Sequence, residues 1–357
     1  MEGFSEGARI VAKRGLAARD CFDSCIPTVK SVMHFTLLVA GALLPGELAV
    51  ALTASLKTQH LKARLSRATE VGRGVSSSTG AAHLDWLAHE LFDRPAPVPT
   101  APYAYTQLAG KPAPAYVWHA DPVHIEVARD HLLVQSLGSD PLTAEESELL
   151  IAAANEFASD FNCEVAGFGE YWFVLSESEW QIDARPLSAV IEGTVELPTG
   201  RDAPIWNRLH NEVQMAWHAH DVNAEREVKG MRTINAIWLH GGGRWKPLAP
   251  IEFAQVHSDA PEWRGAAQAA GALGLPASAP LADAALVVDD NAFVSKQRQD
   301  WGAWLRAMTI IDQTLIDYPA ASIDLILCGD TQRTFQMRPS DRYKPWRRRT
   351  LAEALTE

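Results

Sequence analysis

A run of apolar residues at positions 34–44 restricts the fold of this chain more than any other feature of its sequence. Leu, Val, Phe and Thr dominate the run, and Pro45, Gly46 and Glu47 end it. The run is too short to cross a bilayer, so we interpret it as a buried strand. A secretory signal is the alternative, because basic residues precede the run. Apolar residues at helical spacing follow over 47–66. A strand followed by a helix predicts an α/β core.

The composition is that of a globular protein able to bury a large core, with 47% hydrophobic and 21% charged residues in a chain of 357. The formal net charge of -12 argues against a broad electrostatic contact with nucleic acid or with an anionic membrane. The chain has four cysteines, which are too few for a disulfide framework at this length. We therefore expect a reduced protein in the cytoplasm.

Changes in composition and periodicity divide the chain into predicted parts: residues 1–32, 33–93, 94–114, 115–200, 201–346 and 347–357. The first part is expected to be disordered, and the native start is either Met1 or Met33. The second part begins the α/β core. The third is rich in proline, which predicts an irregular linker without helix. The remaining parts are a smaller α+β portion, a second α/β part and a basic tail. We interpret the tail as solvated, with a local anion or partner contact as the alternative.

The predicted elements form an α/β fold with a mixed central sheet and helices on both faces, plus the smaller α+β portion. Thr143 and Glu146 match a capping box, which predicts a helix that begins there and ends near residue 161. Residues 285–288 predict a buried strand, and 295–317 predict one long amphipathic helix. Residues 323–338 predict a closing hairpin of two strands.

The densest group of chemically capable side chains lies between residues 210 and 243. Helical phase gives the first half of this segment an apolar stripe, with His218 and Asp221 on a polar strip beside it. Such a strip is where a helix lines a cleft. A strand over 233–239 then leads to His240 and a glycine triplet. Glycines at the end of a strand let a ligand or another backbone approach closely.

Three functional interpretations of this segment compete with a structural one. A metal site would use His218, His220 and Asp221, although a helix turns the two imidazoles apart. An esterase oxyanion loop would need a nucleophile elbow, and the sequence has no G-x-S-x-G. An anionic ligand would be held by basic residues and the glycine backbone, with a histidine for proton transfer; the basic residues are Arg226, Lys229 and Arg232, and the histidine is His210 or His218. In the structural interpretation, the polar side chains satisfy backbone groups at a tight helix–strand junction.

The same segment carries a motif that resembles the signature of the RpfE-type regulatory proteins, which are related to the archaeal-type cofactor-independent phosphoglycerate mutases. The residues that carry the motif are Asn211, Glu212, Gln214, Met215, His218, His220, Val222, Asn223, Arg226, Glu227, Gly230, Ile234, Asn235, Trp238, Gly241, Gly242 and Gly243. Asp121 and His124 belong to a second matching element, A-D-P-V-H. Residues 335–346 resemble the basic and aromatic C-terminus of the family, so the resemblance covers most of 33–346.

The resemblance implies an alkaline-phosphatase-like fold in a degenerate form. The related mutases use two divalent metals and a Ser or Thr nucleophile, and their first strand ends in carboxylate ligands. The corresponding residues here, 39–45, contain no carboxylate, so the sequence does not support a two-metal site. We therefore expect a mutase-like regulatory protein without that chemistry. Its partner would be a small anionic or phosphorylated ligand, or another protein.

The resemblance also points to candidate site residues. Those for ligand binding are Asn223, Arg226, Asn235, Trp238, Gly241, Gly242 and Gly243. Those for acid–base catalysis are His218, His124 and Asp121. Two alternative functions stay open. The first is an active metal-dependent phosphotransferase or mutase, and the second is a single-metal enzyme of another class. The first alternative requires a set of side chains to converge, namely Asp121, His124, His218, His220 and Asp221.

Overall fold

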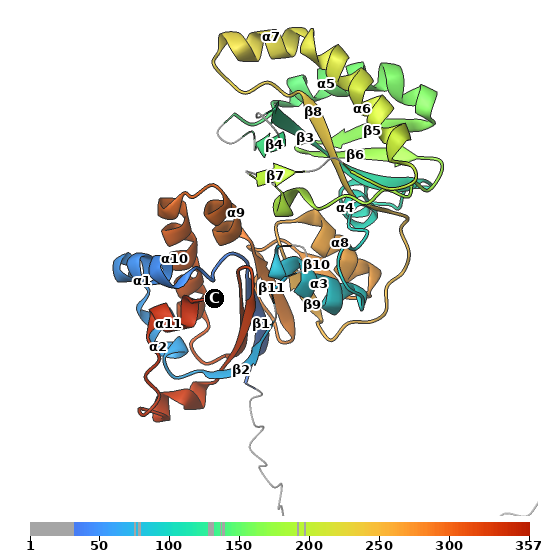
Figure 1. Ribbon diagram of the computed structural model, residues 1–357. Coiled ribbons are helices and arrows are strands. Elements are labelled where there is room, and N and C mark those ends of the chain that lie inside the picture. The colour runs from blue at the N-terminus through green and yellow to red at the C-terminus, as the bar shows by residue number, and fades with distance from the viewer. Residues whose placement is uncertain are drawn as a thin grey trace, which may run out of the picture. The chain divides into compact units, whose positions relative to one another are not determined.

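The computed structural model describes residues 32–74, 76–77, 80–127, 132–135, 137, 140–190, 193–195 and 198–357. The expected disordered extension over 1–32 therefore lies outside the described residues, apart from Val32. In the described part, the named strands gather in two sheets, against which helices pack (Figure 1). None of the described helices combines the length and the apolarity that crossing a membrane requires.

The larger sheet is mixed and has the strand order β10-β9-β11-β1-β12-β13-β2. Its strands are β1 (His34–Val39), β2 (Thr69–Arg73), β9 (Gln255–His257), β10 (Leu273–Leu275), β11 (Ala285–Asp289), β12 (Ser322–Cys328) and β13 (Gln332–Met337). The first five strands of this order are parallel, whereas β13 is antiparallel to both of its neighbours. The predicted central mixed sheet is confirmed, with the apolar run of the sequence at its centre.

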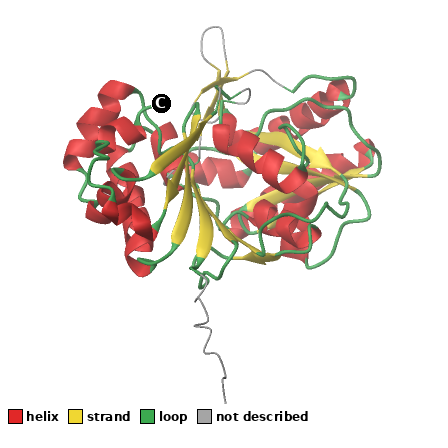
Figure 2. Ribbon diagram, turned by 90° about the horizontal axis from the view of Figure 1, so that it is seen from below, coloured by secondary structure: helices red, strands yellow, loops and turns green. Residues whose placement is uncertain are grey.

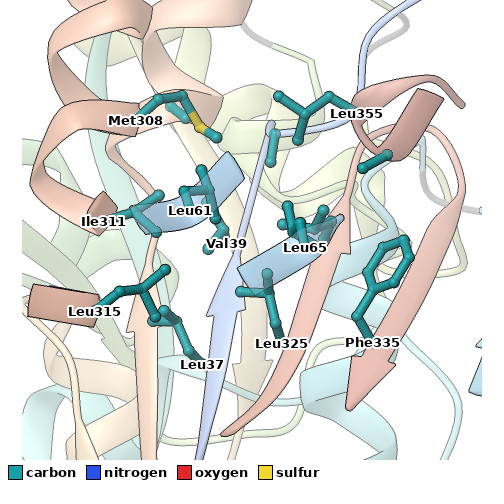
Figure 3. Packing of buried hydrophobic residues seen from close by; sticks show 14 of the residues in the cluster. Leu37, Val39, Leu61, Leu65, Met308, Ile311, Leu315, Leu325, Phe335 and Leu355 are labelled. Atoms are coloured by element: carbon teal, nitrogen blue, oxygen red, sulfur yellow. The ribbon is translucent and has the colours of Figure 1, made fainter. Parts of the chain in front are cut away.

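Helices cover both faces of this sheet (Figure 2). Successive side chains of a strand point to opposite faces, so an apolar strand has side chains to bury on both. Leu37 and Val39 of β1 pack in one hydrophobic cluster (Figure 3), and Leu38 and Ala40 pack in another. Helices of the first cluster are α1 (Gly46–Ser55), α2 (Gln59–Leu65), α10 (Trp301–Asp317) and α11 (Leu351–Leu355). Those of the second are α3 (Ala82–Phe92), α4 (Ala101–Ala109) and α8 (Pro261–Ala269).

The smaller sheet is antiparallel and has the order β5-β6-β3-β4-β7, with β8 pairing with β3. Its strands are β3 (Tyr116–Val127), β4 (Leu132–Gln135), β5 (Cys163–Phe168), β6 (Tyr171–Ser176), β7 (Gly193–Val195) and β8 (Ala236–Gly243). One face packs against α5 (Ala144–Ala158) and α6 (Ala203–His218), through a cluster that includes Trp172, Trp206 and Trp217. The next helix, α7 (Asp221–Val228), follows α6 directly, and short 3-10 helices lie at Ser159–Phe161, Leu187–Ala189 and Pro339–Tyr343.

Two predictions about irregular segments were wrong. The proline-rich segment 94–114 contains α4, because Pro102 lies at the start of the helix, where no backbone N–H is required, and Gly110 ends it in a left-handed conformation. The basic tail is not solvated as a whole. Leu355 is fully buried in the first hydrophobic cluster, and Arg349 pairs with Glu70 at 3.0 Å.

The capping box of α5 is confirmed, since Thr143 accepts from the N–H of Glu146 and Glu146 accepts from that of Thr143. The predicted long helix over 295–317 is instead divided between α9 (Asn291–Gln297) and α10. Gln299 has a φ of 54° at the break, and Asp300 caps the N-terminus of α10. The side chain of Asp300 accepts from the N–H of Ala303, so a new helix begins there rather than a continuation.

Candidate metal centre

The structure places the polar residues of the central motif in contacts within the chain. The guanidinium of Arg226 is fully buried and donates to Glu146 at 3.0 Å and to the carbonyl oxygens of Asp140 and Arg232. The amide of Asn223 bonds the backbone of Trp217 and Ile234, each at 2.8 Å. These contacts match the structural interpretation of the segment, in which the side chains satisfy buried groups.

Asn235 and Trp238 also bond to backbone. The side chain of Asn235 accepts from the N–H of Ile125 at 2.7 Å and donates to its carbonyl oxygen at 2.9 Å. The indole N–H of Trp238 donates to the carbonyl oxygen of Arg185 at 2.9 Å. Asn235 therefore joins the start of β8 to β3.

The structure does not bring together the histidine and aspartate side chains that the active-mutase alternative requires. His124 bonds the carbonyl oxygen of Thr233, and His220 caps α7 by accepting from the N–H of Val222. His218 and Asp221 are exposed. Asp121 lies instead beside His240, whose Nε2 is 2.7 Å from its Oδ2.

The glycine triplet lies inside β8 rather than beyond its end, and it allows close approach of other parts of the chain. A Cβ on Gly241 would lie 2.4 Å from Oγ1 of Thr100, and one on Gly242 would lie 2.1 Å from the ring of Trp118. Gly241 also has a φ of 59°, in the left-handed region that favours glycine. Side chains at these positions would force apart the segments that pack on β8.

The pairing of β3 with β8 assembles a cluster of possible metal ligands. His119 and Asp121 are two residues apart on β3, so they share a face of the sheet, and His240 is the register partner of His119. The two imidazoles stack with centroids 4.6 Å apart. One ligand atom from each of His119, Asp121 and His240 lies within 4.8 Å of the others, and the described residues contain no other such group.

The environment of this cluster favours the protonation states that a metal needs. Burial lowers the pKa of His119 to about 3, which keeps its imidazole neutral. Burial opposes ionisation of Asp121, but the adjacent His240 outweighs it and lowers the pKa of that carboxyl. Neutral imidazole and carboxylate are the ligand forms of these groups. Nδ1 of His240 is buried and has no hydrogen-bond partner among the described residues.

A carboxyl group of α8, the helix that follows β9, interacts with the same cluster. Burial raises the pKa of Glu262, in the first turn of α8, to about 7, with a further rise from Asp290 and Asp121 and an opposing effect of His240. Asp290 follows the last residue of β11, where burial and Asp289 raise its pKa. The cluster therefore faces the carboxyl edge of the parallel strands, where α/β proteins bind their ligands.

Two imidazoles and a carboxylate are a ligand set for a divalent transition metal such as zinc or iron. Three protein ligands leave coordination positions for water or substrate, which is the arrangement of catalytic rather than structural zinc sites. Sequence reasoning missed His119, Glu262 and Asp290. The signal for His119 was the H-x-D spacing on a strand, which places His119, not His124, on the face of Asp121.

A pocket of about 590 Å³ adjoins the cluster. Gly241 lines this pocket, and a Cβ on Gly241 would lie 3.1 Å from Cδ2 of His119, so Gly241 separates the pocket from the cluster, whose own three residues do not line it. Arg94, Arg244 and Lys246 also line the pocket. Glu179 and Asp183 line it too, so the basic residues leave a small excess of positive charge.

Comparison with known proteins supports the fold alone. No family model and no curated protein matches the chain. The structure of the PH0037 protein from Pyrococcus horikoshii matches with a TM-score of 0.50 and 11% identity, over 91% of this chain and 92% of that one. A cofactor-independent phosphoglycerate mutase from Thermoplasma acidophilum DSM 1728 matches at 0.38 and 14%, over 86% and 90%. The first match shows a shared α/β fold, and the second is too distant to carry an argument.

Replacing Arg226 with Ala should destabilise the protein by about 3 kcal/mol, because Glu146 and two carbonyl oxygens lose a buried partner. Urea unfolding measures this loss. Lys229→Ala is the matched control on the same helix, since its ion pair with Glu225 is exposed and contributes about 0.5 kcal/mol or less. An unchanged stability of Arg226→Ala, with anion binding lost, would instead make Arg226 a ligand-binding residue.

Replacing His210 with Phe should flatten the dependence of stability on pH. Burial lowers the pKa of His210 to about 4, whereas an unfolded histidine titrates near 6.5. As the pH falls below about 6.5, the unfolded chain binds a proton that the folded chain does not, so this residue makes the free energy of unfolding decrease. The decrease in the free energy of unfolding between pH 7 and pH 5 should be smaller in the variant by about 2 kcal/mol.

Urea unfolding at the two pH values tests this expectation. His218→Phe on the same helix is the control for exchanging an imidazole for a phenyl ring, because that side chain is exposed. Equal pH dependence in wild type and His210→Phe would show that His210 takes up a proton in the folded protein.

Proposed function

We propose that this chain is a metal-dependent enzyme that hydrolyses small anionic esters, with one divalent transition-metal ion held by His119, Asp121 and His240. The convergence of their ligand atoms within 4.8 Å carries the proposal. When bound, such an ion activates water and polarises the oxygen of a substrate. This is the single-metal alternative that the sequence left open, with a different set of residues.

The surroundings of the cluster support a small anionic substrate. Arg94, Arg244 and Lys246 line the adjoining pocket of about 590 Å³, a size typical of small-molecule sites. Glu179 and Asp183 line the same pocket and offset part of this charge, and the remaining excess is positive, which suits a small anion. Glu262, in the first turn of α8, interacts with His240 and Asp121 of the cluster, and burial raises the pKa of its carboxyl group to about 7.

The end of β1 argues against the two-metal route of the mutases that the sequence resembles. Ala40 and Gly41 follow the strand where those enzymes have carboxylates. A Cβ on Gly41 would lie 2.3 Å from Cα of Phe293, so the backbone at the start of α9 fills the position. A mutase-like regulatory protein that binds metal and anion without turnover is the second candidate, and this closed position favours it.

Elemental analysis of protein purified without chelator should give about one transition-metal ion per chain. His240→Ala should lower the metal affinity by a factor on the order of 100 or more, because it removes a direct ligand. His218→Ala is the control, since His218 lies outside the cluster and is exposed. Two ions per chain would favour a two-metal enzyme, and no ion after incubation with zinc, iron, manganese or cobalt would refute the site.

Hydrolysis of p-nitrophenyl phosphate separates the enzyme from the regulatory candidate. Turnover that chelator and His240→Ala abolish, and that His218→Ala retains, supports the enzyme. Stoichiometric metal binding without turnover of this or a carboxylate ester supports the regulatory candidate.

A further inference from the structure

A second pocket, of about 470 Å³, lies at the other edge of the larger sheet. Val32 precedes β1, Ala320 precedes β12 and Met337 ends the antiparallel β13, and all three line it. The pocket is therefore at the amino-terminal edge of the parallel strands, whereas the candidate metal centre faces their carboxyl edge. We call it the arginine pocket, after the arginines that line it: Arg64, Arg67, Arg338 and Arg342.

These arginines form no ion pair with a carboxylate of the described residues, although the charge of Asp341 acts on Arg64. Among the described residues, none of the four has a carboxylate oxygen within 4.0 Å. One carboxylate, that of Asp341, lines the pocket, and both of its oxygens are engaged. Oδ2 accepts from the N–H of Arg338 at 2.8 Å, and Oδ1 accepts from Nζ of Lys344 at 2.6 Å. In a chain with a net charge of -12, such an excess of cations in one pocket is a local exception.

The arginines of the neighbouring basic tail differ from those of the pocket, because Arg347 and Arg349 are engaged in contacts within the chain. Arg347 donates to the carbonyl oxygen of Arg67 and to Thr69, and Arg349 pairs with Glu70. These side chains fasten the C-terminal segment to the strand β2 and the residues before it. The sequence cannot separate the two groups of arginines, and the structure does.

Three of the pocket arginines, Arg64, Arg338 and Arg342, donate hydrogen bonds within the chain without using all of their donors. Arg64 donates to the carbonyl oxygens of Tyr318 and Ala321, at 3.3 and 2.7 Å. Arg338 donates to Gln336 at 3.1 Å, and Arg342 donates to the hydroxyl of Tyr343 at 2.7 Å. A guanidinium has further N–H groups beyond these bonds, and its planar fork matches phosphate and carboxylate oxygens.

We propose that the arginine pocket binds a small organic phosphate, with the phosphate on the guanidinium groups and an apolar body against Val32, Pro319 and Pro339. The phosphate would gain charge-assisted bonds from side chains of two segments, those of Arg64 and Arg67 on one side and of Arg338 and Arg342 on the other. The apolar body fits because these three residues give the pocket an apolar wall. This site is independent of the metal centre and of the proposed hydrolysis.

Calorimetric titration of the full chain with phenyl phosphate tests the proposal. Wild type should bind phenyl phosphate, should bind inorganic phosphate more weakly and should not bind phenol. The double variant R338Q/R342Q should lose affinity for phenyl phosphate by a factor on the order of 10 or more, since two charge-assisted donors are removed. Both side chains are exposed, so the melting temperature should stay the same and report a folded variant.

Two controls locate the binding. Arg306→Gln removes an exposed arginine of α10 that does not line the pocket, and it should leave the affinity as it is. The titrations contain EDTA, so that the proposed metal centre holds no ion and does not hydrolyse the probe, and the affinity for phenyl phosphate should stay the same with and without EDTA. Binding that EDTA abolishes would belong to the metal centre and refute the assignment. Equal affinity of wild type and R338Q/R342Q, equal binding of phenol and phenyl phosphate, or no binding by wild type would each overturn the proposal.

Discussion

The antiparallel pairing of β3 with β8 is the constraint on which the candidate site depends. Side chains alternate between faces along a strand, so a slip of one residue would turn His240 away from His119 and Asp121. Asn235 prevents such a slip by bonding both the N–H and the carbonyl oxygen of Ile125. Asn223 of α7 bonds the N–H and carbonyl oxygen of Ile234, one residue earlier, and so holds the segment that leads into β8. Asn235, a residue of the distinctive motif, thus fixes the register that brings the ligands together.

The fold follows from the sequence where local signals agree with burial. The apolar run at 34–44 and the capping box of α5 predicted elements that the structure contains, because each depends on residues close in the chain. The helix α4 was missed for the opposite reason. Prolines exclude a helix interior but not its first turn, and the position of Pro102 within the helix depends on where the chain turns.

The site could be predicted only in part, because its members come from segments far apart in the chain. Asp121 was a candidate from the sequence, but its partner is His240 rather than the nearby His124. No local pattern shows which strand lies beside β3. The burial of Arg226 depends equally on a remote residue, Glu146, which the sequence assigned to a helix cap alone. Glu146 serves both purposes, since a carboxylate accepts more than one hydrogen bond.

These contacts show that the sequence resemblance in this segment concerns the local structure more than the chemistry. The asparagines and the arginine of the motif form hydrogen bonds within the chain. Such a motif indicates a shared helix–strand junction, and the same junction is compatible with different chemistry nearby. The chemistry of the site depends on the side chains that this junction positions, which here are His240 and, opposite it, His119. At the end of β1, by contrast, the backbone near Phe293 packs against Gly41 and leaves no room for a ligand side chain. The scaffold therefore places its ligand set on the smaller sheet, facing the edge where α/β proteins bind their ligands.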